Sequence, residues 1–116
     1  MTKATIFHNP RCSKSRETLA LLETNQAEIT IVEYLKTPPS AAQINELLSL
    51  LNISPRQMMR TKETEYKAQN LADNSLTDQQ LVAAMINTPK LIERPIVLAN
   101  GQAAIGRPPE NILAIL

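Results

Sequence analysis

The sequence contains one cysteine and one histidine among its 116 residues, and it has no tryptophan. A single cysteine cannot form a disulfide within the chain, so no internal disulfide framework supports the fold. A structural zinc site usually takes four cysteine or histidine ligands, and one residue of each type cannot supply them. We therefore expect neither a disulfide scaffold nor a zinc site.

Long hydrophobic runs and an excess of charge of one sign are also missing. No apolar stretch approaches the ~20 residues that cross a bilayer. The N-terminal Met1-Thr2-Lys3 leads directly into a strand-like run without a signal-peptide pattern. Twelve basic and eleven acidic residues leave a net charge of +1, whereas a general nucleic-acid surface is normally strongly basic. We expect a cytoplasmic protein that binds neither nucleic acid nor membrane.

The remaining composition is that of a globular protein. Hydrophobic residues make up 43% of the chain, which argues against a disordered sequence. A chain of 116 residues can bury a core of its own. We expect residues 1–116 to form a single domain.

Hydrophobic periodicity predicts alternating strands and helices. We expect strands at 4–7, 29–34, 96–99 and 102–105, with Asn100-Gly101 as a two-residue hairpin turn. We expect helices at 13–24, 41–51 and 78–87, shorter helical segments at 55–60 and 63–69, and a final helix that begins at Pro108-Pro109. The order is strand–helix–strand, a helical insert at about 40–88, then strand–strand–helix. This order matches a thioredoxin-like α/β fold with a mixed four-stranded sheet.

The only cysteine, Cys12, lies in a polar turn at the start of a predicted helix. Backbone N–H groups at a helix N-terminus are unpaired and carry partial positive charge, which stabilises a thiolate or a bound oxyanion. Arg11, Lys14 and Arg16 add a general positive field. We interpret Cys12 as a reactive thiolate beside an anion site. The alternative is a small buried residue without chemistry, but such cysteines usually lie in apolar runs.

Ser15 occupies the position that a second cysteine takes in Cys-x-x-Cys oxidoreductases. A hydroxyl is a poor replacement for a thiol as nucleophile. Any cycle that oxidises Cys12 must therefore be completed by an outside thiol, from glutathione or a partner protein. Ser15 is interpreted either as a hydrogen-bond donor to the thiolate or simply as an early helix residue.

Five segments of the sequence resemble the glutaredoxin-coupled arsenate reductases. Their order and spacing match the family over essentially the whole chain. The longest members continue beyond the position of Leu116, so the resemblance is to a shorter subgroup. The five segments are His8-Asn9-Pro10-Arg11-Cys12-Ser13-Lys14-Ser15-Arg16, Tyr34-Leu35-Lys36-Thr37-Pro38-Pro39, Met58-Met59-Arg60, Glu93-Arg94-Pro95-Ile96-Val97 and Gly106-Arg107-Pro108-Pro109-Glu110.

The resemblance assigns three separated arginines, Arg60, Arg94 and Arg107, to binding the oxyanion and stabilising its thiol adduct. Guanidinium forks suit the oxygens of a tetrahedral anion such as arsenate. Taken singly, each arginine lies at an element boundary, where a solvated surface residue is the usual interpretation. The family also places a cis proline opposite the active-site cysteine, and Pro95 matches that position.

The only histidine, His8, lies four residues before Cys12 and outside any predicted helix. In the related reductases the histidine at this position is thought to help activate the cysteine. An imidazolium beside the thiol would favour the thiolate. The alternative is a histidine that only satisfies the hydrogen bonds of a turn.

The resemblance implies that the protein reduces arsenate to arsenite through a thiol-arsenate adduct. Glutathione would be the reductant and glutaredoxin the partner that accepts the disulfide, with no bound cofactor. Two other functions remain open. One is a glutathione-dependent thiol oxidoreductase that acts on another substrate. The other is a non-enzymatic regulator that binds RNA polymerase, although such relatives usually carry Cys-x-x-Cys as a redox switch.

Overall fold

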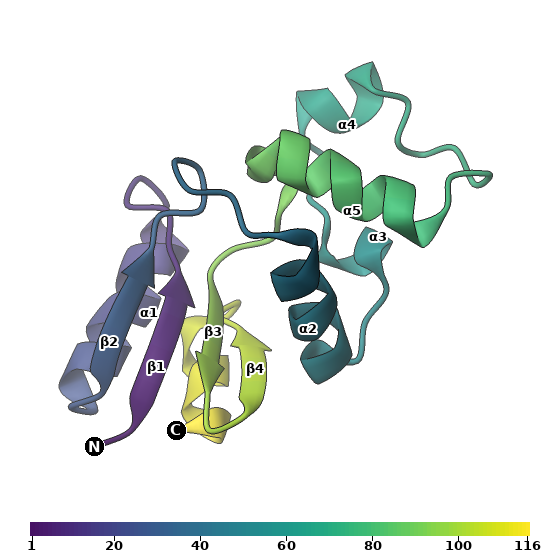
Figure 1. Cartoon of the computed structure of the whole chain (residues 1–116). Helices are drawn as coiled ribbons and strands as arrows, with labels where there is room; N and C mark the ends of the chain where they lie inside the picture. Colours follow the sequence, from purple (N-terminus) through teal and green to yellow (C-terminus); the bar gives the residue numbers. More distant parts are fainter. The chain divides into compact units, whose positions relative to one another are not determined.

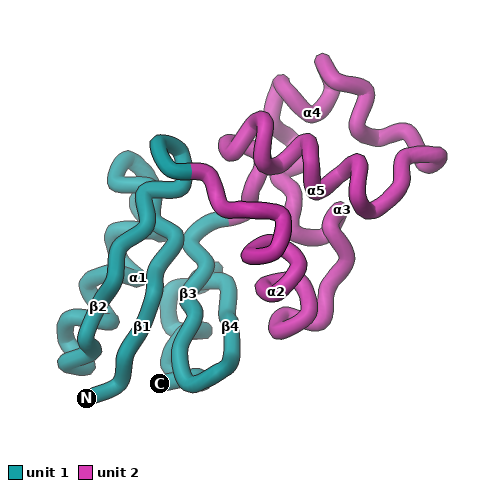
Figure 2. Tube along the Cα trace, viewed as in Figure 1, with its two compact units in different colours: residues 1–37, 94–116 teal, residues 38–93 magenta.

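A computed structural model describes residues 1–116, and the chain divides into two compact units (Figure 2). Unit 1 comprises Met1–Thr37 and Arg94–Leu116, and unit 2 comprises Pro38–Glu93. Unit 1 is therefore assembled from both ends of the chain, and unit 2 from its middle. That residues 1–116 act as one domain stays a prediction.

Unit 1 is built on a four-stranded sheet in the order β2-β1-β3-β4 (Figure 1). The strands are β1 Lys3–Phe7, β2 Glu28–Val32, β3 Ile96–Ala99 and β4 Gln102–Ile105. β1 pairs in parallel with β2 and antiparallel with β3, and β3 pairs antiparallel with β4. The predicted mixed sheet is confirmed.

One face of this sheet is buried against two helical segments, α1 Ser13–Thr24 and the 3-10 helix η2 Pro109–Ile115. α1 connects the parallel strands β1 and β2, as the connection between parallel strands requires. Alternating side chains of β1 point into this core, because successive residues of a strand face opposite sides. The buried cluster comprises Ala4, Ile6, Leu22, Val97, Ala99, Ile112 and Ile115.

Three elements of unit 1 differ from the sequence-based expectation. β1 begins at Lys3 rather than at position 4, and β2 begins at Glu28 rather than at position 29. The second strand ends at Val32 rather than at position 34, because Lys36 and Thr37 both donate to the Glu33 carbonyl and close a turn. The final helix is a 3-10 helix that begins at Pro109. The hairpin between β3 and β4 agrees with the expectation.

Unit 2 is helical, with α2 Ala41–Leu51, α3 Pro55–Met58, α4 Thr64–Ala68, α5 Asp78–Asn87 and the 3-10 helix η1 Pro89–Leu91. Three of these helices begin with a capping box, in which a Ser or Thr hydroxyl and a Gln side chain satisfy backbone N–H groups reciprocally. Met58, Met59 and Met85 are buried in this unit. The capping-box pairs of α2, α3 and α5 are Ser40 with Gln43, Ser54 with Gln57 and Thr77 with Gln80.

None of the helices combines the length and the apolar character that crossing a bilayer requires. The structure also contains no group of three or more His, Cys, Asp and Glu side chains that could hold a metal ion.

Candidate active site

The loop after β1 presents Cys12 at the start of α1. The Arg11 N–H donates to the Asn9 side-chain oxygen at 3.0 Å, and the Cys12 N–H donates to the Asn9 carbonyl at 3.0 Å. Cys12 is the N-cap residue of α1, and no side chain caps the helix. The thiol therefore lies where the first-turn N–H groups have no intrahelical partner, which is a favourable place for negative charge.

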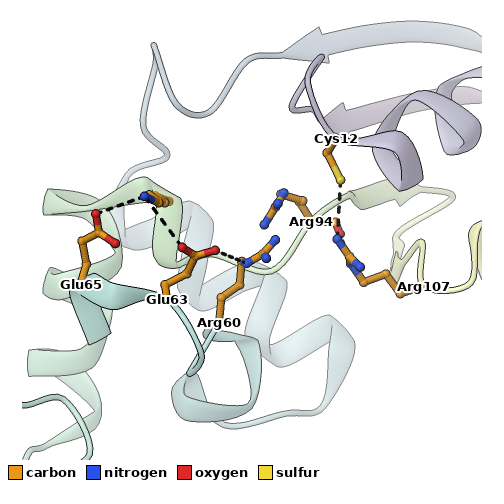
Figure 3. Close-up of polar contacts among 7 residues, drawn as sticks. Cys12, Arg60, Glu63, Glu65, Arg94 and Arg107 are labelled. Atoms are coloured by element: carbon orange, nitrogen blue, oxygen red, sulfur yellow. Dashed lines mark hydrogen bonds and ion pairs between the residues drawn. The ribbon is translucent and has the colours of Figure 1, made fainter. Parts of the chain in front are cut away.

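A guanidinium lies next to this thiol (Figure 3). Arg107 Nη2 is 3.6 Å from Cys12 Sγ. The same guanidinium is held from its other side, because Arg107 Nε donates to the Arg94 carbonyl oxygen at 2.7 Å. A fixed cation at this distance stabilises a thiolate and any negative charge that develops on an anion bound there.

Arg94 and Arg107 flank the β3–β4 hairpin, and each is followed by a cis proline. The Arg94-Pro95 bond is cis, as the resemblance implies. The Arg107-Pro108 bond is also cis, which the sequence analysis did not anticipate. The Gly106 N–H donates to the Pro95 carbonyl at 2.9 Å and joins the two ends of the hairpin. The structure thus brings Cys12 together with two of the three predicted arginines.

His8 and Ser15 form a buried pair beneath the same loop. His8 Nδ1 lies 2.6 Å from Ser15 Oγ, and Ser15 Oγ also accepts from the Asn9 N–H at 3.0 Å. The hydrogen bond of the imidazole is thus made with Ser15 rather than with the thiol. If the neutral ring carries its proton on Nε2, Ser15 donates its only hydrogen to His8 and has none left for Cys12.

Burial lowers the pKa of His8 below its ordinary value of 6.5; nearby Glu33 raises it, and Arg16 lowers it further. The imidazole is therefore predominantly neutral at pH 7. The charged imidazolium considered from the sequence is disfavoured in this environment, so the formal positive charge in contact with the thiol is that of Arg107. A catalytic role for His8 stays a prediction.

Arg60 belongs to unit 2, whereas the other predicted site residues belong to unit 1. Its backbone N–H donates to the Leu91 carbonyl at 2.7 Å, and its Nε lies 3.1 Å from Glu63 Oε1. The side chain is 24% exposed, which differs from the freely solvated arginine that an element boundary usually carries. The grouping of Arg60 with Cys12 stays a prediction.

Two residues that hold the Cys12 loop and Arg60 in place were not predicted from the sequence. Asn9 is named above only within the segment that resembles the family, although Asn before Pro is a common start of a turn and its side chain here accepts from the Arg11 N–H. Glu63 was not considered. Its spacing of three residues from Arg60 gave no clear signal, because that spacing brings side chains together only within a helix and Arg60 lies between α3 and α4.

Comparison with known proteins places this chain in a family. The ArsC family model matches residues 7–115. An arsenate reductase of Neisseria meningitidis is 48% identical over 117 residues, covering 100% of each chain, and the uncharacterised Escherichia coli protein YfgD is 57% identical over 118 residues, covering 100% of this chain and 99% of that one. The solved structure of an arsenate reductase from Vibrio cholerae superposes with a TM-score of 0.96 at 52% identity, covering 99% and 98% of the two chains, and confirms the predicted thioredoxin-like fold class. The chain belongs to the ArsC family.

Proposed function

We propose that this protein is an arsenate reductase in which Cys12 is the nucleophile. The observation that carries the proposal is the Arg107 guanidinium, 3.6 Å from the only thiol of the chain, at a helix start that no side chain caps. Membership of the ArsC family and the activity named for the 48%-identical Neisseria relative support arsenate as the substrate.

In the first step the Cys12 thiolate attacks the arsenic of arsenate. A sulfur–arsenic bond forms, one arsenic–oxygen bond breaks, and that oxygen leaves as water after protonation. Arsenic stays in the +5 state. By resemblance to the family, Arg60, Arg94 and Arg107 are the proposed ligands of the oxyanion, and their guanidinium groups would stabilise the charge of the adduct.

In the second step an outside thiol must act, because the chain contains no second cysteine. A glutathione thiolate attacks Cys12 Sγ, a disulfide forms, and the sulfur–arsenic bond breaks. The bonding electron pair stays with arsenic, which leaves as arsenite in the +3 state. A glutaredoxin thiolate then attacks the glutathione sulfur and releases Cys12 as thiolate. The cycle uses glutathione as reductant, needs no bound cofactor, and suits the reducing cytoplasm.

The test is arsenate-dependent NADPH consumption coupled through glutathione, glutaredoxin and glutathione reductase. We expect turnover by the wild-type chain and none by Cys12→Ser, which keeps the size of the side chain but loses the thiolate. Turnover that survives Cys12→Ser would exclude the mechanism. If arsenate fails but a glutathione mixed disulfide is reduced in a Cys12-dependent way, the protein is a thiol oxidoreductase with another substrate.

A further inference from the structure

Four charged side chains form a chain of ion pairs in unit 2 (Figure 3). Arg60 Nε lies 3.1 Å from Glu63 Oε1, and Lys90 Nζ lies 3.8 Å from Glu63 Oε2. Lys90 Nζ also lies 3.2 Å from Glu65 Oε2. Signs alternate along the chain, so each carboxylate faces a cation. Glu63 is thereby fixed between Arg60 and Lys90.

A backbone hydrogen bond and partial burial also restrict Glu63 relative to Arg60. The backbone N–H of Glu63 donates to the Arg60 carbonyl at 3.2 Å, which fixes the spacing between the two residues. Its side chain is only 20% exposed. An ion pair between long, exposed side chains contributes little because both must be ordered, whereas here backbone and burial have already restricted the carboxylate.

The ion pair leaves two guanidinium nitrogens of Arg60 without a hydrogen bond. Arg60 Nε and Nη1 are both buried and have no hydrogen-bond partner, although Nε is close enough to Glu63 for a charge interaction. Proteins hydrogen-bond the great majority of their buried polar groups, so these two nitrogens are available to an acceptor. A guanidinium with open N–H groups suits the oxygens of a tetrahedral anion.

We infer that Glu63 is a positioning residue, which restrains Arg60 by charge so that its open N–H groups are preorganised for an oxyanion. Lys90 in turn keeps Glu63 in place and offsets part of its negative charge. The inference rests on the proposed function, in which Arg60 binds the arsenate oxyanion. It assigns to Glu63 a role that acts on the substrate only through Arg60.

The experiment compares Glu63→Gln with Glu65→Gln. Both substitutions remove one negative charge next to Lys90, but only Glu63 touches Arg60. We expect Glu63→Gln to raise the arsenate KM by about fivefold, as for loss of one favourable ion pair, with kcat changed less. The dissociation constant for arsenate, measured by calorimetry in the Cys12→Ser background, should rise by the same factor. Glu65→Gln should change neither constant appreciably.

A double-mutant cycle with Arg60→Ala isolates the interaction. Glu63→Gln should have no further effect on arsenate binding once Arg60 is removed. If Glu63→Gln and Glu65→Gln weaken or strengthen arsenate binding equally, the effect comes from the overall electrostatic potential rather than from the contact with Arg60. That result would overturn the inference. If Glu63→Gln does not fold, Glu63→Asp replaces it, and a wild-type arsenate affinity there would overturn the inference.

Failure of the inference differs from failure of the proposed function. Wild-type turnover with arsenate binding that is insensitive to Glu63→Gln refutes the role of Glu63 alone. Absence of wild-type turnover refutes the reductase assignment. In that case the calorimetric titration still decides the role of Glu63, because arsenate binding that depends on Arg60 and Glu63 supports it and absence of such binding refutes it.

Discussion

At the scale of single residues, the contact between Arg107 and Cys12 determines where positive charge meets the thiol. Arg107 Nη2 lies 3.6 Å from Cys12 Sγ, and the Arg94 carbonyl holds Nε of the same side chain. Arg11 is adjacent to Cys12 in sequence but exposed. Charge in direct contact stabilises a thiolate more than an equal charge that water screens.

We therefore predict that Arg107→Ala slows the alkylation of Cys12 by iodoacetamide at pH 7 by about fivefold, the effect of losing roughly 1 kcal/mol of charge interaction. Pseudo-first-order rates measure it directly, since the chain has one thiol. Arg11→Ala is the matched control, with the same change in net charge. Equal slowing in Arg107→Ala and Arg11→Ala would contradict the view that direct contact with Arg107 stabilises the Cys12 thiolate.

His8 provides a second prediction at this scale. Burial lowers its pKa below the ordinary 6.5, so an NMR titration of this only histidine should give a midpoint below that value. At a pH between the lowered pKa of His8 in the folded chain and the ordinary pKa of 6.5 in the unfolded chain, the unfolded chain binds a proton that the folded chain does not. The contribution of a neutral His8 to stability is thus full above pH 6.5 and is lost as the pH falls below it.

Urea denaturation of wild type and His8→Asn between pH 7.5 and 5.5 tests this sign. Asn keeps a side-chain acceptor near Ser15 and does not titrate. The free energy of unfolding of the wild type, relative to the variant, should decrease as the pH falls. An increase would mean that His8 is preferentially charged in the folded protein.

At the scale of elements, Gly106 sets the approach of the C-terminal hairpin to α1. A Cβ at position 106 would overlap Thr18 Oγ1 and lie 2.8 Å from Pro95 Cγ. Thr18 is fully buried, and its hydroxyl donates to the Lys14 carbonyl at 2.8 Å. Only glycine allows this contact, because the neighbouring atoms belong to a packed core.

We predict that Gly106→Ala lowers the free energy of unfolding by about 2 kcal/mol, within the usual range for overpacking. Thr18→Ala removes two of the three crowded atoms, so the double variant should be less destabilised than the sum of the single variants. Urea denaturation of all four proteins measures the coupling. Additive effects would show that the overlap is relieved elsewhere.

The elements themselves were largely predictable, and the reason is local chemistry. The boundaries of α1, α2 and α5 agree with the sequence because the apolar periodicity is clear. In α2 and α5, Ser40 and Thr77 also cap the helix together with a Gln three residues later. The end of β2 was not predictable, because backbone hydrogen bonds to Glu33 terminate it and Tyr34 continues the β-favouring pattern. The cis bond before Pro108 has no signal in the sequence.

At the scale of the whole molecule, the connectivity favours cooperative unfolding. Unit 1 is discontinuous, since β1 near the N-terminus pairs with β3 near the C-terminus. The chain therefore leaves the sheet after β2, forms residues 38–93 and returns to the sheet at β3. Loss of that sheet would remove the restraint on both ends of unit 2.

The two tyrosines allow a test of the single-domain prediction, since Tyr34 lies in unit 1, Tyr66 lies in unit 2 and the chain has no tryptophan. In Tyr66→Phe the remaining fluorescence reports on unit 1, and in Tyr34→Phe on unit 2. We expect the fluorescence and far-UV circular dichroism midpoints in urea to coincide within each variant. Separate midpoints would show two independent domains.

The sequence by itself determined the order of elements, the helix start that carries Cys12, and the need for an outside thiol. These follow from local periodicity, capping residues and the number of cysteines. Only the tertiary structure decided which arginine meets the thiol, because Arg107 is 95 positions away and β-strand pairing brings it back. It also decided that His8 pairs with Ser15 and favours the neutral form, since desolvation depends on what the whole fold packs around a side chain.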